Sequence, residues 1–331
     1  MPHSLPRDRL LALLDAGRSK RIAILGDAML DVYLQGDVDR ISPEAPVPVV
    51  RVRERRLALG GAANVAQNVA ALGAASDLVA VVGGDVSGTM LRELLGAVAD
   101  QRSLVEVSRP TTTKTRILAR SQQVVRFDEE DDADLTGAEI DRLLEAARAA
   151  ILESDALVLE DYNKGVLVPK VIEASIAWAR DRGLPIVVDP KYRNFFTYRG
   201  ATVFKPNRRE LEAALGAAVD LEHPEALPET FRRLGVGSLL LTLGERGMAL
   251  IEPSGAIHPI PTMAREVYDV VGAGDTVTAY LATMLAAGAT VREAAVIANL
   301  AAGVEVGKLG AATVTPDELL DAYDHFAPAP G

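Results

Sequence analysis

The chain has 331 residues, of which 49% are hydrophobic and 24% charged, a composition typical of one large globular core or two smaller domains. Its formal net charge of −11 disfavours nucleic acid and anionic membranes as general partners, because both would repel it. The absence of cysteine excludes disulfides, thiolate metal sites and cysteine nucleophiles, and it suits a reducing cytoplasm.

The first residues, MPHSLPRDRLLALLDAGRSKR, lack the features of a secretory signal. Their apolar run, residues 10–14, is short, and acidic residues interrupt the segment. The leucine spacing instead predicts a short amphipathic helix that packs on the body. No apolar run approaches the length of a membrane span, so we expect a cytoplasmic protein without a membrane partner.

Along the chain, short β-branched runs alternate with stretches rich in alanine and leucine. Predicted strands cover residues 21–27, 76–85, 155–162, 185–190, 201–207 and 237–247. Predicted helices cover residues 61–74, 87–98, 168–183 and 208–216. This alternation, with continuously apolar strands, predicts an α/β fold in which helices cover both faces of a mainly parallel sheet. No linker or repeat divides the chain, so we expect a single domain over residues 1–331.

Two segments depart from this alternation. Residues 32–58 contain three prolines and alternating valine and arginine, and residues 110–128 alternate apolar and polar side chains. Such period-two alternation is typical of half-exposed, antiparallel strands. Both segments would fit a small sheet that projects from the body as a lid or a dimer surface. The alternative is a pair of irregular surface hairpins.

The stretch VYDVVGAGDT, residues 267–276, reads as an apolar strand that turns sharply into the helix VTAYLATMLAAG. Gly272 and Gly274 allow a ligand to approach the backbone, and the unpaired N–H groups of a helix start attract anions. Asp275, beside such donors, is better placed to remove a proton than to bind an anion. The alternative is that Asp275 only caps the helix.

Residues that could serve a nucleotide lie upstream of this turn, and the chain has no GxxxxGK[ST] loop. Asn207 and Glu210 stand three apart at a predicted helix start, where they could hold hydrated Mg²⁺ or simply form a capping pair. Thr242, Gly244 and Gly247 follow another strand. Their glycines could admit phosphates or make a β-turn.

Polar residues near the N-terminus suit a polyhydroxylated ligand. Asp27 and Asp31 follow the first strand, and Gly60, Gly61 and Asn64 occupy a helix start. Carboxylates and amides accept and donate the hydrogen bonds that a sugar offers. Neither motif is decisive alone.

Together these motifs resemble the ribokinase-like (PfkB) carbohydrate kinases. The order matches over residues 22–315: GD…D, GGAAN, a mid-chain DP, NRRE, TLGERG and DVVGAGDT. The resemblance implies a three-layer α/β/α sandwich with a projecting β lid, and phosphoryl transfer from ATP with Mg²⁺ and in some members a monovalent cation. Positioning and electrostatics carry such a transfer.

The resemblance also implies roles for individual positions. Asp275 would be the base that deprotonates the acceptor hydroxyl, and the backbone of Gly272, Ala273 and Gly274 would bind the transferring phosphoryl. The ATP and Mg²⁺ side would comprise Asn207, Arg208, Arg209, Glu210, Thr242, Gly244, Gly247 and Asn299, with Asn207 and Glu210 at the metal, through water. The sugar side would comprise Asp31, Gly60, Gly61, Asn64, Lys114, Arg116, Asp161, Asn163, Lys164 and Lys191.

Within the family, GDAMLDVYLQGDVDRISPEAPVPVV, GGAANVAQNVAALGA and DYNKG are similar to kinases that phosphorylate D-glycero-β-D-manno-heptose 7-phosphate at O1 for lipopolysaccharide synthesis. In many relatives this domain is fused to a nucleotidyltransferase. Because this sequence ends at Gly331, we expect that second activity from another protein or from a part of the gene product not included.

A phosphorylated acceptor needs cations at the sugar end of the site, and Lys114, Arg116, Lys164 and Lys191 would supply them. The alternative is that these residues mark the exposed face of a strand. Asn163, where some relatives carry glycine, departs from the family pattern at the sugar end. It leaves open fructose 1-phosphate, tagatose 6-phosphate or ribose as acceptors, and also a non-catalytic sensor on the same fold. The resemblance further implies a homodimer through the lid sheets, which would cover exposed strand edges.

Overall fold

The central sheet contains nine strands in the order β13-β12-β11-β10-β9-β8-β1-β4-β5 among residues 5–120, 122–221, 227–264 and 267–326, which the computed structural model describes. Neighbours from β11 to β5 run parallel, whereas β12 and β13 are antiparallel additions. The strands are β1 (Arg21–Gly26), β4 (Ala75–Gly83), β5 (Leu104–Val107), β8 (Ala156–Glu160), β9 (Ile186–Asp189), β10 (Val203–Phe204), β11 (Ser238–Thr242), β12 (Met248–Ile251) and β13 (Ile257–Ile260). The predicted mainly parallel sheet is confirmed.

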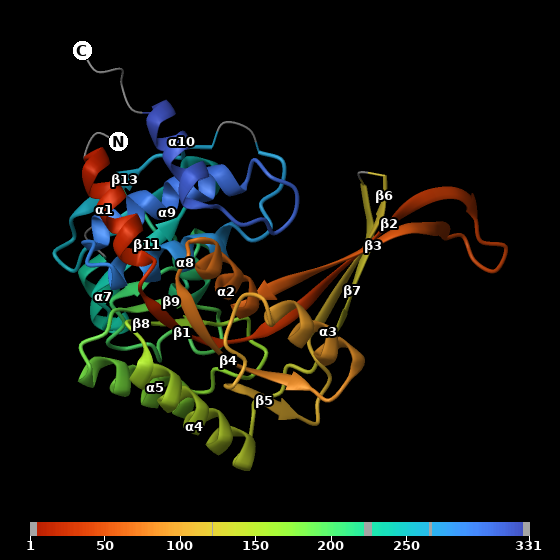
Figure 1. Cartoon of the computed structure of the whole chain (residues 1–331), viewed down its shortest axis with the longest axis horizontal. Coiled ribbons are helices and arrows are strands. Elements are labelled where there is room, and N and C mark those ends of the chain that lie inside the picture. Colours follow the sequence, from red (N-terminus) through yellow and green to blue (C-terminus); the bar gives the residue numbers. More distant parts are fainter. Residues whose placement is uncertain (1–4, 121, 222–226, 265–266, 327–331) are drawn as a thin grey trace.

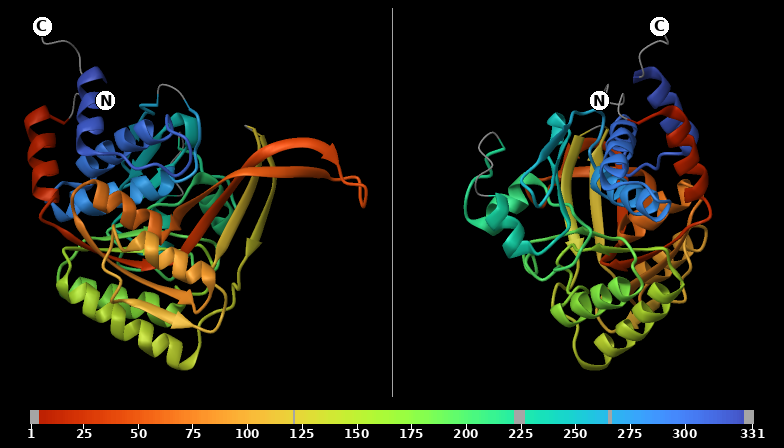
Figure 2. Two further views of the ribbon diagram at one scale, coloured as in Figure 1. Left: turned by 45° about the vertical axis from the view of Figure 1, so that its right-hand side comes forward. Right: turned by 90° about the vertical axis from the view of Figure 1, so that its left-hand side faces the viewer.

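Helices cover both faces of this sheet (Figures 1 and 2). On one face lie α1 (Arg7–Gly17), α2 (Ala62–Ala71), α3 (Val86–Leu95), α8 (Ala273–Ala286), α9 (Val291–Glu305) and α10 (Pro316–Phe326). On the other lie α4 (Gly137–Glu153), α5 (Pro169–Asp181), α6 (Arg208–Leu215) and α7 (Leu227–Leu234). Both faces of the sheet need a cover of helices because successive side chains of a strand point to opposite faces. In β1, Ile22 and Ile24 enter one core, and Ala23 and Leu25 enter the other. Both faces of the strand are therefore apolar, and the three-layer architecture is confirmed.

A second sheet projects from the body (Figure 1). Its strands β2 (Ala28–Ile41), β3 (Pro48–Gly61), β6 (Thr113–Ala119) and β7 (Gln122–Glu129) lie in the order β3-β2-β6-β7, and we call it the lid. The pairs β2–β3 and β6–β7 are antiparallel, and β2–β6 is parallel. The half-exposed strands predicted within residues 32–58 and 110–128 thus form one sheet rather than separate surface hairpins.

One predicted strand is absent. The apolar residues before the glycine turn form irregular backbone, and Val267, Tyr268 and Val270 are 62%, 72% and 67% exposed. Val267 and Val270 line a cavity described below instead of joining the sheet. An apolar run can thus serve a binding surface as well as a strand core. The predicted N-terminal helix is confirmed as α1, and within the described residues no helix has both the length and the apolar character to cross a membrane.

Strands β1 and β8 approach closely where both end. Gly26 is opposite Glu160, and the N–H of Asp27 donates to the carbonyl of Glu160 at 3.1 Å. A Cβ at Gly26 would lie 2.0 Å from that carbonyl oxygen. This close approach leaves room only for glycine at the strand end that leads into the functional site.

We therefore expect Gly26→Ala to lower the free energy of unfolding by about 3 kcal/mol, because the backbone of β8 would have to shift. Gly96→Ala is the matched control, since a Cβ there would meet first the end of the Gln101 side chain, at 3.2 Å. Urea unfolding of both variants measures the difference. Equal stability of the two variants would contradict this account of β1 and β8.

Candidate active site

The candidate site lies at the carboxyl ends of the central parallel strands, where α/β sheets bind ligands. Strand β1 ends at Gly26, β8 at Glu160 and β9 at Asp189, and the chain after β10 continues directly into Lys205. Helix α8 starts at the same edge and contacts β8, β9 and β1. The ends of β1, β8, β9 and β10 thus form one side of the site, and the start of α8 forms the other.

Asp275, in the first turn of α8, is 4% exposed and hydrogen-bonded at both oxygens. The amide of Asn64 donates to Oδ2 at 2.7 Å, and the hydroxyl of Tyr162 donates to Oδ1 at 2.8 Å. Burial raises the pKa of Asp275 to about 6, while these two hydrogen bonds act in the opposite direction. The result is a carboxylate that is charged at neutral pH yet able to accept a proton.

The glycine turn sits beside this carboxylate. Gly272 has a φ of 95° and precedes the first helical residue, Ala273. A Cβ at Gly272 would lie 3.0 Å from the Asn64 amide, and one at Gly274 would lie 3.6 Å from the ammonium of Lys205. The first residues of the helix therefore lie close to the amide of Asn64 and the ammonium of Lys205, and a helix start with a cation beside it favours an anion.

Two further acids accompany Asp275: Glu160, which the motif analysis did not single out, and Asp189 of the mid-chain DP, to which it gave no role. Carboxylate oxygens of Glu160, Asp189 and Asp275 lie within 4.8 Å of one another, and all three residues are buried. Burial raises the pKa of Glu160 well above its usual range, with Asp189 adding to the effect. Lys205, 3% exposed, binds Asp189 at 2.8 Å. Only the register of strands far apart in sequence reveals this cluster.

A cavity of about 500 Å³ opens next to the glycine turn. It contains the ATP-side residues predicted from sequence, Thr242, Gly244, Gly247 and Asn299, and it reaches Ala273 and Gly274. Its remaining walls are mostly apolar, including Val267, Val270, Val277, Ala302 and Val306. An apolar cleft with a few polar groups, ending at an anion-binding turn, suits a planar base joined to phosphates.

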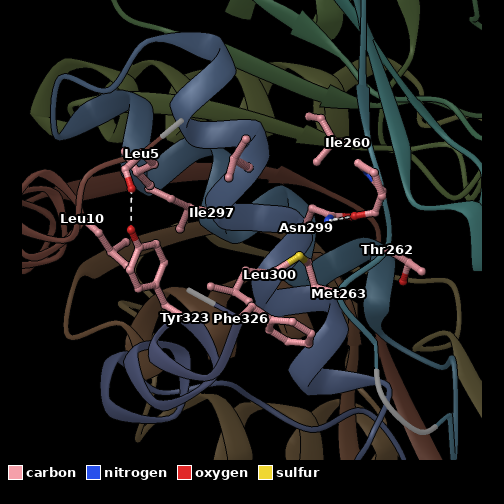
Figure 3. Close-up of a pocket in the computed structure, with 12 residues that line it drawn as sticks. Leu5, Leu10, Ile260, Thr262, Met263, Ile297, Asn299, Leu300, Tyr323 and Phe326 are labelled. Atoms are coloured by element: carbon pink, nitrogen blue, oxygen red, sulfur yellow. Dashed lines mark hydrogen bonds between the residues drawn. The ribbon is translucent and has the colours of Figure 1, made fainter. Parts of the chain in front are cut away.

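Asn299 also borders a second, separate pocket of about 240 Å³ between α1, α9, α10 and the chain after β13 (Figure 3). The Asn299 amide donates to the carbonyl of Pro261 at 2.8 Å and so fixes the wall between the two spaces. Leu10, Ile297 and Phe326 are among the apolar side chains in this second pocket. Asn299 therefore supports the wall of the larger cavity with a hydrogen bond to the backbone.

Asn207 and Glu210 form a capping box at the start of α6. Asn207 Oδ1 accepts from the N–H of Glu210 at 2.9 Å, and Glu210 Oε2 accepts from the N–H of Asn207 at 2.8 Å. Glu210 Oε1 also binds the ammonium of Lys191 at 2.6 Å. The structural alternative raised for this pair thus describes their contacts, although Asn207 also bridges to Thr242 beside the cavity.

The flanking arginines point to other partners. Arg208 binds Glu212 at 2.8 Å and the carbonyl of Val219 at 2.9 Å, both within or just after α6. Arg209 is exposed and does not line the cavity. The structure therefore gives neither arginine a place in the nucleotide cavity.

On the other side of Asp275, the lid strands meet the body. Asp31 binds Arg116 at 2.6 Å, and a Cβ at Gly60 would lie 2.8 Å from Asp31. Gly61, with a φ of 56°, lies under the ring of Tyr162, since its Cβ position is 3.5 Å from that ring. Gly60 thus lies beside the pair of Asp31 and Arg116, and Gly61 lies beside the tyrosine that holds Asp275.

Tyr162 is flanked by two ammonium groups. The Nζ atoms of Lys114 and Lys191 each lie 5.2 Å from its ring centroid. Burial lowers the pKa of Lys114, whereas for Lys191 the carboxylates of Asp189 and Glu210 outweigh burial and raise the pKa. Two cations from distant segments thus converge beside the hydroxyl that holds Asp275.

The DYNKG loop has mainly structural contacts. Asp161 accepts from the hydroxyl of Tyr198 and from the N–H of Asn163, both at 2.7 Å, so it faces into the core. Lys164 binds Glu130 at 2.6 Å. Asp27, considered above as a sugar ligand, accepts from three N–H groups of this loop, including that of Tyr162. Asp27 and Asp161 therefore hold the loop that carries Tyr162.

These features define a phosphotransferase of sugar-kinase type, and comparison with known proteins agrees. The family model described as pfkB family carbohydrate kinase matches residues 19–318, so the chain belongs to this family. The expectation of a carbohydrate kinase is confirmed.

One relative, the bifunctional protein HldE of Rhodospirillum rubrum, is 47% identical over 306 residues, which cover 91% of this chain and 62% of that protein. The chain thus spans about three fifths of that relative. Ribokinase of Arabidopsis thaliana, solved with ribose and ATP, shares the fold with a TM-score of 0.73 and 20% identity over 92% of this chain and 99% of that one. Phosphofructokinase-2 of Escherichia coli, solved with potassium, shares the fold with a TM-score of 0.74 and 20% identity, over 93% of this chain and 99% of that one.

We expect Asp275→Asn to lower kcat by at least about 10³-fold while leaving ATP affinity unchanged, because an amide cannot take the acceptor proton. The native enzyme should lose kcat/KM as the pH falls through about 6, because protonation removes the charged base. ADP release and nucleotide titration measure these effects. Near-normal turnover of the variant would show that Asp275 is not the base.

Proposed function

We propose that the chain transfers the γ-phosphoryl group of ATP to O1 of D-glycero-β-D-manno-heptose 7-phosphate, giving the 1,7-bisphosphate for ADP-heptose and lipopolysaccharide synthesis in the cytoplasm. The observation that carries this choice is the pair of ammonium groups, Lys114 and Lys191, which each lie 5.2 Å from the ring of Tyr162. Tyr162 itself touches the base Asp275. A sugar whose hydroxyl reaches Asp275 would bring a distant phosphate toward these cations. The similarity to a bifunctional HldE protein supports the same choice.

In this mechanism, the hydroxyl of the sugar donates its proton to Oδ1 or Oδ2 of Asp275 as its oxygen attacks the γ-phosphorus of ATP, and the bond from that phosphorus to the bridging oxygen breaks to release ADP. Asn64 and Tyr162 hold the carboxylate in place through both oxygens, so its lone pairs face the acceptor in a fixed direction. The N–H groups at Gly272–Gly274 bind the oxygens of the phosphoryl group while it is transferred. The lid closes the sugar side and limits access of water.

ATP would occupy the cavity next to the glycine turn, whose apolar walls suit adenine. Asn207 and Glu210 lie at the edge of this region, and a carboxylate together with an amide oxygen fits hydrated Mg²⁺. Glu210 would then release Lys191 to hold the water around this ion, and the pair is only partly buried, with the side chains of Lys191 and Glu210 27% and 16% exposed. When bound, Mg²⁺ neutralises charge on the phosphates.

A monovalent cation would fit behind the glycine turn. Asp269 accepts there from the N–H of Gly310 at 3.1 Å, and Glu305 is fully buried nearby. Burial raises the pKa of Glu305 to about 8, with Asp269 adding to the effect. A cation between these two acids would relieve their repulsion.

The acceptor is tested by ADP release with Mg·ATP across heptose 7-phosphate, unphosphorylated heptose, ribose, fructose 1-phosphate and tagatose 6-phosphate. We expect a preference of at least about 100-fold in kcat/KM for heptose 7-phosphate, because two cations are desolvated for its phosphate. Lys114→Met should raise KM for this acceptor by about 10-fold or more without changing KM for ATP.

Arg53→Met serves as the control, since Arg53 is a lid cation that pairs with Asp37 and is 59% exposed. Turnover with only another sugar would agree with kinase activity but would exclude heptose 7-phosphate as the acceptor. Equal effects of Lys114→Met on phosphorylated and unphosphorylated acceptors would exclude a phosphate contact at Lys114.

We also propose that two chains associate through their lids. Strand β7 is exposed along its length and forms the edge of the lid, with Val125 and Phe127 47% and 45% exposed. Further exposed apolar residues, Val38, Ile41, Val47 and Val52, lie on β2, β3 and the turn that joins them. An exposed edge strand that carries apolar side chains favours self-association.

Val125→Lys combined with Phe127→Lys should convert the dimer into a monomer, because charges would be buried at the interface. Sedimentation velocity reports the mass directly. Val86→Lys is the control, because Val86 is 70% exposed on the body. A monomeric native protein, or a dimer that the double variant retains, would contradict association through the lid.

A further inference from the structure

A buried ion pair lies directly beside the candidate base. The ammonium of Lys205 binds Asp189 at 2.8 Å, and their side chains are 3% and 9% exposed. Lys205 follows β10, and Asp189 is the last residue of β9, so adjacent parallel strands deliver the pair. Burying two charges is costly, and a pair at this depth is retained only where its contacts are good or its charges are used.

The position of this pair relates it to the chemistry. Oxygen atoms of Asp189, Glu160 and Asp275 lie within 4.8 Å of one another. The ammonium of Lys205 lies 3.6 Å from where a Cβ of Gly274 would be, and Asp189 Oδ2 lies 3.7 Å from the same point. The pair thus lies against the turn that carries the anion-binding N–H groups and the base.

Charge balance explains why an ammonium is present. Two carboxylates this close repel each other, so without a cation one of them would take up a proton. Both oxygens of Glu160 lack a hydrogen-bond partner among the described residues, and burial keeps the pKa of this acid far above its usual range. Burial thus favours the uncharged form of Glu160, while the ammonium of Lys205 compensates the neighbouring Asp189 at 2.8 Å.

Polar and charged groups from several elements act on Asp275 or lie against the residues that contact it. Uncharged donors come from α2 and from the loop after β8, acids from β8, β9 and α9, and cations from β6 and from the segments after β9 and β10. They are Asn64, Tyr162, Glu160, Asp189, Glu305, Lys114, Lys191 and Lys205. Among the cations, Lys191 is bound to Glu210, and Lys114 lies beyond the ring of Tyr162. Lys205 is the ammonium inside the carboxylate cluster.

We propose that Lys205 is a positioning residue of the kinase reaction, whose buried ammonium, held by Asp189, keeps Asp275 in the charged form that accepts the proton. The base then depends on an ion pair that it does not touch through a hydrogen bond. The 2.8 Å contact with Asp189 and the burial of both side chains fix this ammonium beside the helix start.

The two halves of the pair predict opposite shifts in the pH profile of kcat/KM. Lys205→Met leaves Asp189 as an uncompensated charge near Asp275, so the acidic limb should move up by about one pH unit. Asp189→Asn leaves the ammonium without its partner, so the limb should move down by a similar amount. The double variant Asp189→Asn with Lys205→Met removes both charges, and its limb should return close to that of the native enzyme.

Each profile is measured by ADP release with the same acceptor, so that titration of the acceptor is common to all variants. Arg21→Met is the matched control, because Arg21 binds the buried Asp77 at 3.2 Å at the opposite end of β1. Arg21→Met should leave the acidic limb of the pH profile of kcat/KM at the same pH as in the native enzyme. If Lys205→Met does not fold, Asp189→Asn alone retains a signed prediction.

Shifts of the two single variants in the same direction would overturn the proposal. So would a uniform fall in rate at every pH with an unmoved limb, which is the result expected of a merely structural pair. The inference rests on the phosphoryl transfer of the proposed function and not on its acceptor. Failure of the heptose assignment would appear in the acceptor panel, whereas failure here would appear in the limb positions with any accepted sugar.

Discussion

The constraint on which the site depends is the burial of a charged carboxylate, Asp275, at a helix start. A buried charge must be compensated by donors or by opposite charge, and each source here comes from a different element. Asn64 arrives on α2, Tyr162 on the loop after β8, and Lys205 after β10. The fold can therefore be understood as the arrangement that brings these donors to one edge of the sheet.

The same constraint accounts for features away from the base. Asp27 and Asp161 are themselves buried acids, and they accept hydrogen bonds that fix the loop carrying Tyr162. The close contact of Gly26 with β8 allows Glu160 to end its strand beside Asp275. These contacts connect the loop that carries Tyr162 to the strand ends on the body side of the site. The lid joins the body through β2 and β3.

Short sequence motifs predicted several of the residues that the structure brings together at the site. The glycine turn, Asp275 and Asn64 were predictable because backbone freedom and a helix start are properties of short segments, and strand alternation predicted the layers of the sheet. Lys205 and Glu160 were not, because only the pairing of distant strands shows that they meet. Residues 267–271 were wrongly predicted as a strand, since apolar residues that line a cavity have the same pattern as a strand core.

The central claim is that Asp275 is a buried base that its two donors keep ionisable near neutrality. It is tested most directly by a ¹³C NMR titration of the aspartate carboxyl groups, with Asp275→Asn used to identify the signal. The account predicts a midpoint near pH 6 that moves upward in Tyr162→Phe, because a donor to the charged form is lost. A midpoint near the ordinary aspartate value of about 3.9, or one that Tyr162→Phe leaves unmoved, would contradict it.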